Sequence, residues 1–195
     1  MLQVPRIAGY DFGKVAGSPL TIEDLNRLKA TVGFTKEDEK ALRRMGDVLS
    51  GEAEALVDEW RKIIGAQDHL WHAFAGPDGK PDDAYKAAVK PRFVQWVKDV
   101  FARPFDQAWL DYQEEIALRH TPAKKNETDH VAAPPVVPLR YLLAFAAPAL
   151  LSARAHLQAK KLSIDEIDAM HAAWTKAVIL SLTLWSRPYA KAEVW

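Results

Sequence analysis

Apolar residues recur along most of the chain at steps of three and four, which is the spacing of one face of an α-helix. The pattern is clearest over residues 52–64, 84–101, 105–120 and 167–185. The second of these stretches carries an apolar stripe made of Tyr85, Val89, Phe93, Trp96, Val97 and Val100. No comparable run alternates apolar and polar residues at a step of two, as a half-buried β-strand would. We therefore predict an all-α fold.

Capping sequences mark the starts of three helices. Thr21-Ile-Glu-Asp, Thr35-Lys-Glu-Asp and Ser163-Ile-Asp-Glu each place a hydroxyl three residues before a carboxylate. At that spacing both side chains can accept hydrogen bonds from free amides of the first turn, and the helix dipole favours the negative charge there. We therefore predict that helices begin directly after Thr21, Thr35 and Ser163.

The stretch that follows Pro138 is apolar on nearly every face, so we predict a central, buried helix there.

The segments between helices differ in character. Residues 1–20 are rich in glycine and proline and predict an N-terminal loop, whereas residues 76–81 predict a tight turn. Residues 121–137 form a longer linker than the roughly 12–15 residues that are usual in compact domains. We therefore expect this linker to cover some other part of the molecule.

Composition restricts the classes of function. A chain of 195 residues can bury a sizeable core, and we expect one domain over residues 1–195. Lys+Arg and Asp+Glu both number 26, so the net charge is zero. A strong electrostatic attraction to nucleic acid or to an anionic membrane is therefore not expected. Cysteine is absent, which excludes disulfides and iron held by a thiolate.

No targeting or membrane segment is evident in the sequence. The first residues lack the basic segment and apolar run that are typical of a secretory signal. The most apolar stretch, residues 141–157, contains Pro148 and Arg154 and is too short to span a bilayer comfortably. We therefore expect a cytoplasmic protein.

Common catalytic and nucleotide-binding signatures are missing, since the chain has no HExxH, CxxC, Walker or GxGxxG pattern. His69 and His72 are three residues apart and can share a helix face, but no carboxylate stands at a convincing spacing to complete a metal site. The simplest interpretation of three other histidines is that they are surface or ordinary core residues: His130, His156 and His171.

His120 has two interpretations on the residues alone. It ends a predicted helix whose buried side includes Ile116, so its imidazole enters apolar surroundings just before the long linker. A neutral imidazole in an aromatic core can supply an axial bond to haem iron. A core histidine at a helix C-terminus is also favourable without any ligand, and the residues alone favour this second interpretation.

Several blocks, in order along nearly the whole chain, resemble the protoglobins, which are single-domain relatives of the globin-coupled sensors. The blocks are Ala8-Gly-Tyr-Asp-Phe-Gly13, Phe34-Thr-Lys-Glu-Asp38, Pro77-Asp-Gly79, Phe105-Asp-Gln-Ala-Trp-Leu-Asp-Tyr-Gln113, Leu118-Arg-His120, Lys124-Lys-Asn126, Leu139-Arg-Tyr-Leu142, Leu184-Trp-Ser186 and Pro188-Tyr189. The resemblance implies a globin fold with an additional N-terminal helix, over about residues 21–31, and an N-terminal loop. It also implies a bound haem b.

The resemblance assigns His120 as the proximal iron ligand. It places Trp60, Phe93 and Phe145 at positions that line the haem pocket, and we expect Arg61, Val89, Ile116 and Leu142 to complete the cofactor-binding surface. It further implies that the N-terminal loop and the 121–137 linker help to bury the haem. A homodimer through the last two helices is the expected assembly.

Two residues depart from what a protoglobin pocket usually shows. Arg61 stands where the family usually carries a tyrosine beside the pocket tryptophan. A buried, unpaired guanidinium is unfavourable, so Arg61 is expected to reach solvent, a haem propionate or an anionic ligand. Pro91 lies inside a predicted helix, where it removes a backbone donor and predicts a kink.

The leading function on these grounds is binding of O2, CO or NO at an open iron position, with no dedicated catalytic residue. The alternatives are a haem enzyme that acts on NO, nitrite or peroxide or supports carbene transfer, and a stand-alone gas sensor. A haem-free helical interaction protein is the remaining alternative.

Overall fold

The computed structural model describes residues 6–49 and 51–195, and helices account for most of these ranges. In chain order they are α1 (Ile22–Thr31), α2 (Lys36–Val48), α3 (Ala53–Gly65), α4 (Asp68–Trp71), the 3₁₀ helix η1 (His72–Phe74), α5 (Asp83–Ala102), α6 (Gln107–Leu118), α7 (Leu139–Ala144), α8 (Ala146–Gln158), α9 (Ile164–Ser186) and the 3₁₀ helix η2 (Arg187–Tyr189). Within these described ranges the only β-pairing is an isolated bridge between Ala75 and Pro81. The predicted all-α class is confirmed.

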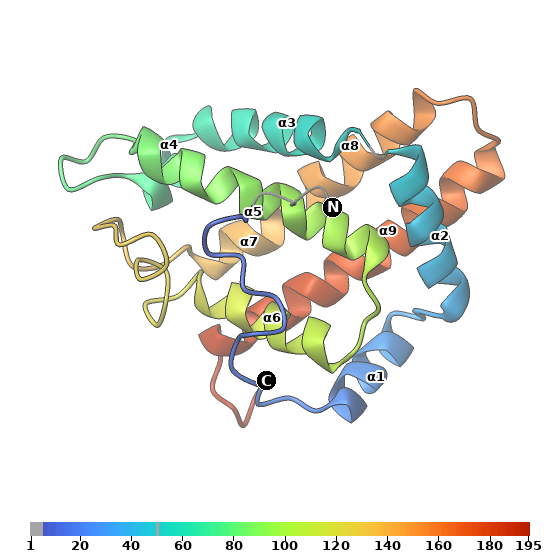
Figure 1. Ribbon diagram of the computed structural model, residues 1–195, viewed down its shortest axis with the longest axis horizontal. Helices are drawn as coiled ribbons and strands as arrows, with labels where there is room; N and C mark the ends of the chain where they lie inside the picture. Colours follow the sequence, from blue (N-terminus) through green and yellow to red (C-terminus); the bar gives the residue numbers. More distant parts are fainter. Residues whose placement is uncertain (1–5, 50) are drawn as a thin grey trace.

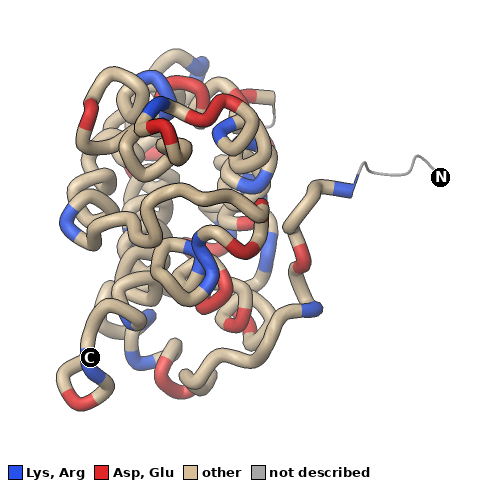
Figure 2. The backbone as a smooth tube through the Cα atoms, turned by 90° about the vertical axis from the view of Figure 1, so that its left-hand side faces the viewer, with Lys and Arg blue, Asp and Glu red and all other residues tan. Residues whose placement is uncertain are grey.

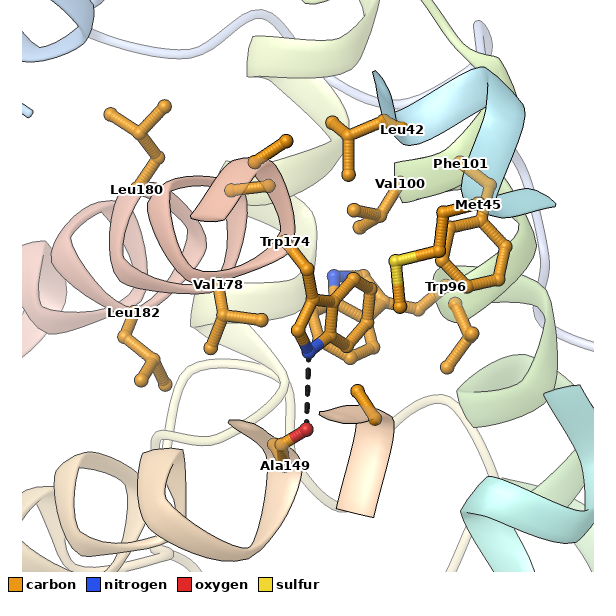
Figure 3. Packing of buried hydrophobic residues seen from close by; sticks show 14 of the residues in the cluster. Leu42, Met45, Trp96, Val100, Phe101, Ala149, Trp174, Val178, Leu180 and Leu182 are labelled. Atoms are coloured by element: carbon orange, nitrogen blue, oxygen red, sulfur yellow. Dashed lines mark hydrogen bonds between the residues drawn. The ribbon is translucent and has the colours of Figure 1, made fainter. Parts of the chain in front are cut away.

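Helix α9 is the centre of the fold. It contacts α2, α6 and α8, and it runs through the middle of the molecule (Figure 1). Its buried side chains include Met170, Trp174, Val178 and Trp185. The indole of Trp174 packs between helices and donates a hydrogen bond from Nε1 to the carbonyl oxygen of Ala149, 3.1 Å away (Figure 3). The apolar stripe predicted for residues 167–185 therefore faces three other helices at once.

The predicted central helix after Pro138 is wrong in two respects. The stretch forms two helices, α7 and α8, which divide at Phe145. It also lies at the surface, because Leu143 is 47% exposed and Leu151 is 68% exposed. Apolar atoms make up more than half of a typical protein surface, so a uniformly apolar sequence does not by itself determine burial. The buried positions of α8 are Ala149, Ala153 and Leu157.

The three predicted capping boxes are present. In each, the hydroxyl residue stands at the N-cap and the carboxylate three residues later accepts from its backbone amide, as in the 3.0 Å bond from Thr21 N to Asp24. Asp38 in the second box also pairs with Lys176 of α9, which ties the start of α2 to the central helix. Helix α5 continues through Pro91, and the kink predicted there stays a prediction.

Residues 6–20 lie outside any helix, as expected for an N-terminal loop, and the first five residues of that prediction lie outside the described part. The segment passes over α5 and α6 and lies along the outside of the helical body (Figures 1 and 2). Basic (blue) and acidic (red) positions are interspersed along the backbone in Figure 2, consistent with the net charge of zero. No helix of the described residues is long and apolar enough to cross a membrane.

Candidate functional site

A cavity of about 280 Å³ lies between α3, α5, α6, the 121–137 linker, the α7–α8 junction and α9. Its volume is close to the lower end of the range typical of ligand pockets, roughly 300–1,000 Å³. The wall is mainly apolar and aromatic. The linker contributes Lys125, Thr128, Asp129 and Val137 to it, so the long linker does cover an internal space, as its length predicted.

The structure brings all eight candidate site residues to the wall of this one cavity: Trp60, Arg61, Val89, Phe93, Ile116, His120, Leu142 and Phe145. They come from α3, α5, α6, α7 and the residues that follow α6 and α7. Sequence separations of up to 85 positions are thereby reduced to contacts around a common space.

His120 lies two residues beyond the last residue of α6, and its imidazole faces the cavity. Its Nδ1 lies 2.8 Å from the carbonyl oxygen of Ile116. A carbonyl oxygen can only accept, so Nδ1 carries the proton and Nε2 keeps its lone pair. Burial lowers the pKa of His120 to about 4, which the Ile116 hydrogen bond opposes and the nearby Lys125 reinforces. The imidazole is therefore neutral at physiological pH, which is the form that binds metals.

The backbone of His120 is fixed from two sides. Its carbonyl oxygen accepts a 2.9 Å hydrogen bond from the amide of Val137, at the far end of the linker. The hydroxyl of Tyr189 lies 2.9 Å from the same oxygen and 2.6 Å from the carbonyl oxygen of Val137. The ring also stacks on Trp185, with centroids 5.5 Å apart and planes at 24°. These contacts set the direction of the imidazole before any ligand binds.

Aromatic side chains form the wall near Trp60. Trp60 is fully buried, and its ring centroid lies 5.2 Å from that of Phe93 and 6.4 Å from those of Phe145 and Trp96. Its Nε1 donates to Ser152 Oγ, 2.7 Å away, which holds the indole in one orientation. The wall on this side of the cavity is therefore aromatic, with Trp60 held in place.

Comparison with known proteins identifies the family. A family model described as Protoglobin matches residues 21–195. The chain belongs to the protoglobin family. Among solved structures, this protoglobin is similar to the globin domain of the Geobacter sulfurreducens globin-coupled sensor, with a TM-score of 0.68 and 16% sequence identity. That match covers 86% of this chain and 98% of the other, and it shows a shared fold. No curated protein matches the chain.

Both the resemblance and the fold class predicted from the sequence are confirmed. The fold is that of a globin, and α1 is the additional N-terminal helix of the protoglobin. Membership of this family makes the chain a haem-binding protein of the globin type. The cavity fits such a group, because it offers an apolar, aromatic wall and one neutral imidazole whose Nε2 has no hydrogen-bond partner among the described residues.

The guanidinium of Arg61 stands at the cavity wall and is partly accessible to solvent. It makes no hydrogen bond and no ion pair with any residue that the structure describes. The orientations expected from the sequence, toward solvent, a haem propionate or an anionic ligand, stay predictions. Lys86 also lines the cavity, and its Nζ pairs with Asp83 at 2.7 Å.

Sequence reasoning missed several residues of the protoglobin's cavity. Trp185, which stacks on His120, appeared only as one position of an apolar stripe. Lys125 was noted only as part of a family block, yet it is 3% exposed and lines the cavity. Lysine is almost never fully buried without a partner, so neither periodicity nor composition could have predicted this placement.

His69 and His72 lie together at a second pocket, beside α4, η1 and α7. The ring of His69 packs on Tyr141, with centroids 4.9 Å apart. In the described part of the protoglobin, no group of three or more histidine and carboxylate side chains is arranged to hold a metal ion. The pair therefore has an aromatic environment and no set of metal ligands around it.

Proposed function

We propose that residues 1–195 form one protoglobin domain that would hold haem b through Nε2 of His120 and would bind diatomic gases at the haem. The observation that carries the proposal is the state of His120: a neutral, oriented imidazole with one free nitrogen inside an apolar cavity. When bound, haem supplies an iron atom with an exchangeable coordination position for O2, CO or NO.

The protein's part in binding is to orient and tune the imidazole. The Ile116 carbonyl accepts the Nδ1 proton, which fixes the tautomer and increases the basicity of Nε2. Tyr189 and Val137 hold the backbone, and Trp185 holds the plane of the ring. These contacts reduce the conformational freedom that would otherwise be lost when a ligand binds.

The aromatic wall supports selectivity by size. Trp60, Phe93 and Phe145 exclude water and leave room only for small, largely apolar ligands. None of the three carries a group that can act as a general acid or base, so they contribute no proton transfer. Val89, Ile116 and Leu142 extend the same apolar surface. This chemistry favours reversible binding over catalysis.

Arg61 favours a second candidate function, the handling of small anions such as nitrite. It is a cation on the cavity wall that has no carboxylate partner in the described part of the chain. A guanidinium presents several donors in a plane and recognises anions well. Gas binding remains the principal proposal because most of the wall is apolar and aromatic.

Absorption spectroscopy of the protein titrated with iron protoporphyrin IX tests the proposal. We expect saturation at one haem per chain, a ferrous spectrum of a five-coordinate histidine-ligated haem, and a reversible shift on addition of CO. A ferrous protein that is six-coordinate with two protein ligands and does not respond to CO contradicts the proposal.

We also propose that two copies associate through α8 and α9. Exposed apolar side chains lie on these helices or at their ends, namely Leu151 at 68%, Ile164 at 59% and Ile179 at 37%. Burial of such residues against a second copy removes apolar surface from water. Light scattering coupled to size-exclusion chromatography should therefore give a mass of about two chains, and a mass of one chain at micromolar concentration contradicts this part of the proposal.

A further inference from the structure

The cations on the cavity wall differ in how their charges are balanced. Six line it: Arg61, Lys86, Lys90, Arg92, Arg119 and Lys125. Four of them have carboxylate partners: Lys86 with Asp83, Lys90 with Glu54 and Asp58, Arg92 with Asp129, and Arg119 with Glu115. Among the described residues, Lys125 and Arg61 have none. Arg61 is partly accessible to solvent, which can balance its charge, whereas Lys125 is not.

The ammonium of Lys125 is held in an environment with little polar character. The residue is 3% exposed, and its Nζ donates to the carbonyl oxygen of Ala73 at 2.7 Å. The ring of Tyr85 lies beneath it, with its centroid 5.2 Å from Nζ. An ammonium has three donors, and in the described structure only one of them has an acceptor. Burial lowers the pKa of Lys125 to about 8, a sign that the charge lacks compensation.

A buried charge without a counter-charge is unfavourable, and proteins normally pair it. A ligand of the cavity that brings a carboxylate would supply the missing partner. The proposed ligand has such groups, because haem carries two propionate carboxylates on an otherwise apolar ring. Pairing with one of them would use the two remaining donors of the Lys125 ammonium and neutralise its charge.

We propose that Lys125 is the buried propionate anchor of this protoglobin, so that the 121–137 linker both covers the cavity and recognises the acid groups of its ligand. The inference rests on the proposed function, since it takes haem as the occupant. The competing explanation is purely structural: Lys125 ties the linker to η1 through Ala73 and contributes nothing to ligand recognition.

A double-mutant-type cycle, which combines a variant of the protein with a modified porphyrin, separates the two explanations. Lys125→Met removes the charge and keeps an unbranched side chain, while the dimethyl ester of iron protoporphyrin IX removes the charge of both propionates. The measurement is the rate of loss of each porphyrin to an excess of a haem-scavenging protein. We expect Lys125→Met to lose the free-acid porphyrin at least about ten times faster than the parent protein. With the diester, the variant and the parent protein should differ by less than about twofold.

Lys124→Met is the matched control. Lys124 is the neighbouring lysine of the same linker, pairs with Glu115 at 2.6 Å, and does not line the cavity. Replacement of Lys124 should change the rates of loss of both porphyrins equally and only slightly. Lys125→Arg keeps a positive charge, so it should retain the free-acid porphyrin better than Lys125→Met does. This variant also provides a folded comparison if the methionine variant is unstable.

Two outcomes overturn the inference. An equal acceleration of loss for both porphyrins shows that Lys125 acts only by holding the linker, and unchanged loss of the free-acid porphyrin shows that it has no role in retention. Neither outcome bears on His120. The ferrous spectrum of the same samples reports the histidine bond, so failure of the proposed function appears as an abnormal spectrum in the parent protein with either porphyrin.

Discussion

Trp60 and His120 each donate a hydrogen bond from one ring nitrogen to an acceptor on the chain. Trp60 Nε1 donates to Ser152 Oγ, and His120 Nδ1 donates to the carbonyl oxygen of Ile116. Both acceptors belong to helices, so both rings are fixed relative to the scaffold. The free Nε2 of His120 and the indole of Trp60, which both line the cavity, are consequently held in defined orientations.

Ser152→Ala tests how strongly the Trp60 orientation depends on its hydrogen bond. Removal of the hydroxyl leaves the buried indole N–H without its acceptor, which costs about 1–3 kcal/mol. We expect chemical denaturation to show a loss of stability in this range. Ser181→Ala is the control, because the buried Ser181 hydroxyl bonds only to Ala177 of its own helix. Equal losses for the two variants would show that the indole bond adds nothing.

Arg61→Leu tests the candidate anion site. A cation at the cavity wall should favour binding of azide or nitrite to the ferric protein, so we expect the variant to bind these anions several-fold more weakly. CO binding to the ferrous protein should change little, because CO carries no charge. Lys62→Leu alters the next residue of α3, which does not line the cavity, and serves as the control. Unchanged anion affinities in Arg61→Leu would show that its guanidinium faces solvent.

The resemblance to protoglobins predicted more of the candidate site than the spacing and polarity of the residues did. From its position and the apolar spacing around it, His120 was predicted only to be a core histidine. The family blocks predicted that it is the iron ligand. Lys125 could not be found in this way. Its burial results from the packing of the linker against η1, and these segments are 52 positions apart at the Lys125–Ala73 hydrogen bond.

Helices α3 and α8 are joined at the surface by a histidine between two carboxylates. His156 Nδ1 lies 2.6 Å from Glu52 and Nε2 lies 2.9 Å from Glu59. Lys160 also pairs with Glu52. Burial alone would lower the pKa of His156, but hydrogen bonds to Glu59 and Glu52 outweigh burial and raise it. The pKa of Glu52 is lowered, mainly by the hydrogen bond from Lys160 and then by that from His156.

These shifts predict how stability depends on pH. Because the pKa of His156 is higher in the folded than in the unfolded protein, protonated His156 stabilises the fold. This stabilisation is complete below the unfolded pKa of about 6.5 and is lost as the pH rises through the folded pKa. We expect thermal denaturation to show a decline above pH 6.5 that is absent in His156→Gln. The difference should be about 0.5–1 kcal/mol, as for other accessible ion pairs. Parallel curves for parent and variant from pH 6 to 9 would contradict the prediction.

The starts of helices could be predicted from the sequence, whereas the burial of whole helices could not. The starts of α1, α2 and α9 follow from side chains three residues apart, so the information lies within one helical turn. The placement of α7 and α8 depends on which neighbours cover them. Leu151 is as apolar as any core residue and yet faces outward, and nothing in its local sequence distinguishes the two cases.

The N-terminal segment links the outside of the molecule to the cavity wall. Arg92 and Arg119, which line the cavity, donate to the carbonyl oxygens of Ala8 and Gly9. Tyr10 packs edge-on against Tyr112, another residue of the wall, with centroids 5.2 Å apart. The segment therefore packs against three residues of the cavity wall, and Figure 1 shows its path over α5 and α6.

Gly9→Ala is expected to detach this segment. Gly9 has φ of +70°, and a Cβ there would lie 2.7 Å from Thr128 Cγ2 and 2.9 Å from Arg92 Nη1. Both the backbone strain and the contacts oppose any side chain. We expect limited proteolysis to cut residues 6–20 several-fold faster, with faster loss of haem. Gly17→Ala is the control, since its added Cβ meets nothing within 4 Å and its φ is not positive. Equal proteolysis of both variants would contradict this account of the segment.

The proposed bond between His120 and haem iron is tested most directly by chemical rescue. His120→Gly removes the imidazole and leaves a space in the cavity wall, which free imidazole can fill. Resonance Raman spectra of the ferrous protein should show an iron–histidine stretch in the parent, no such band in the variant, and its return when imidazole is added. A variant that keeps the parent's band without added imidazole would show that another side chain holds the iron, and would contradict the assignment of His120.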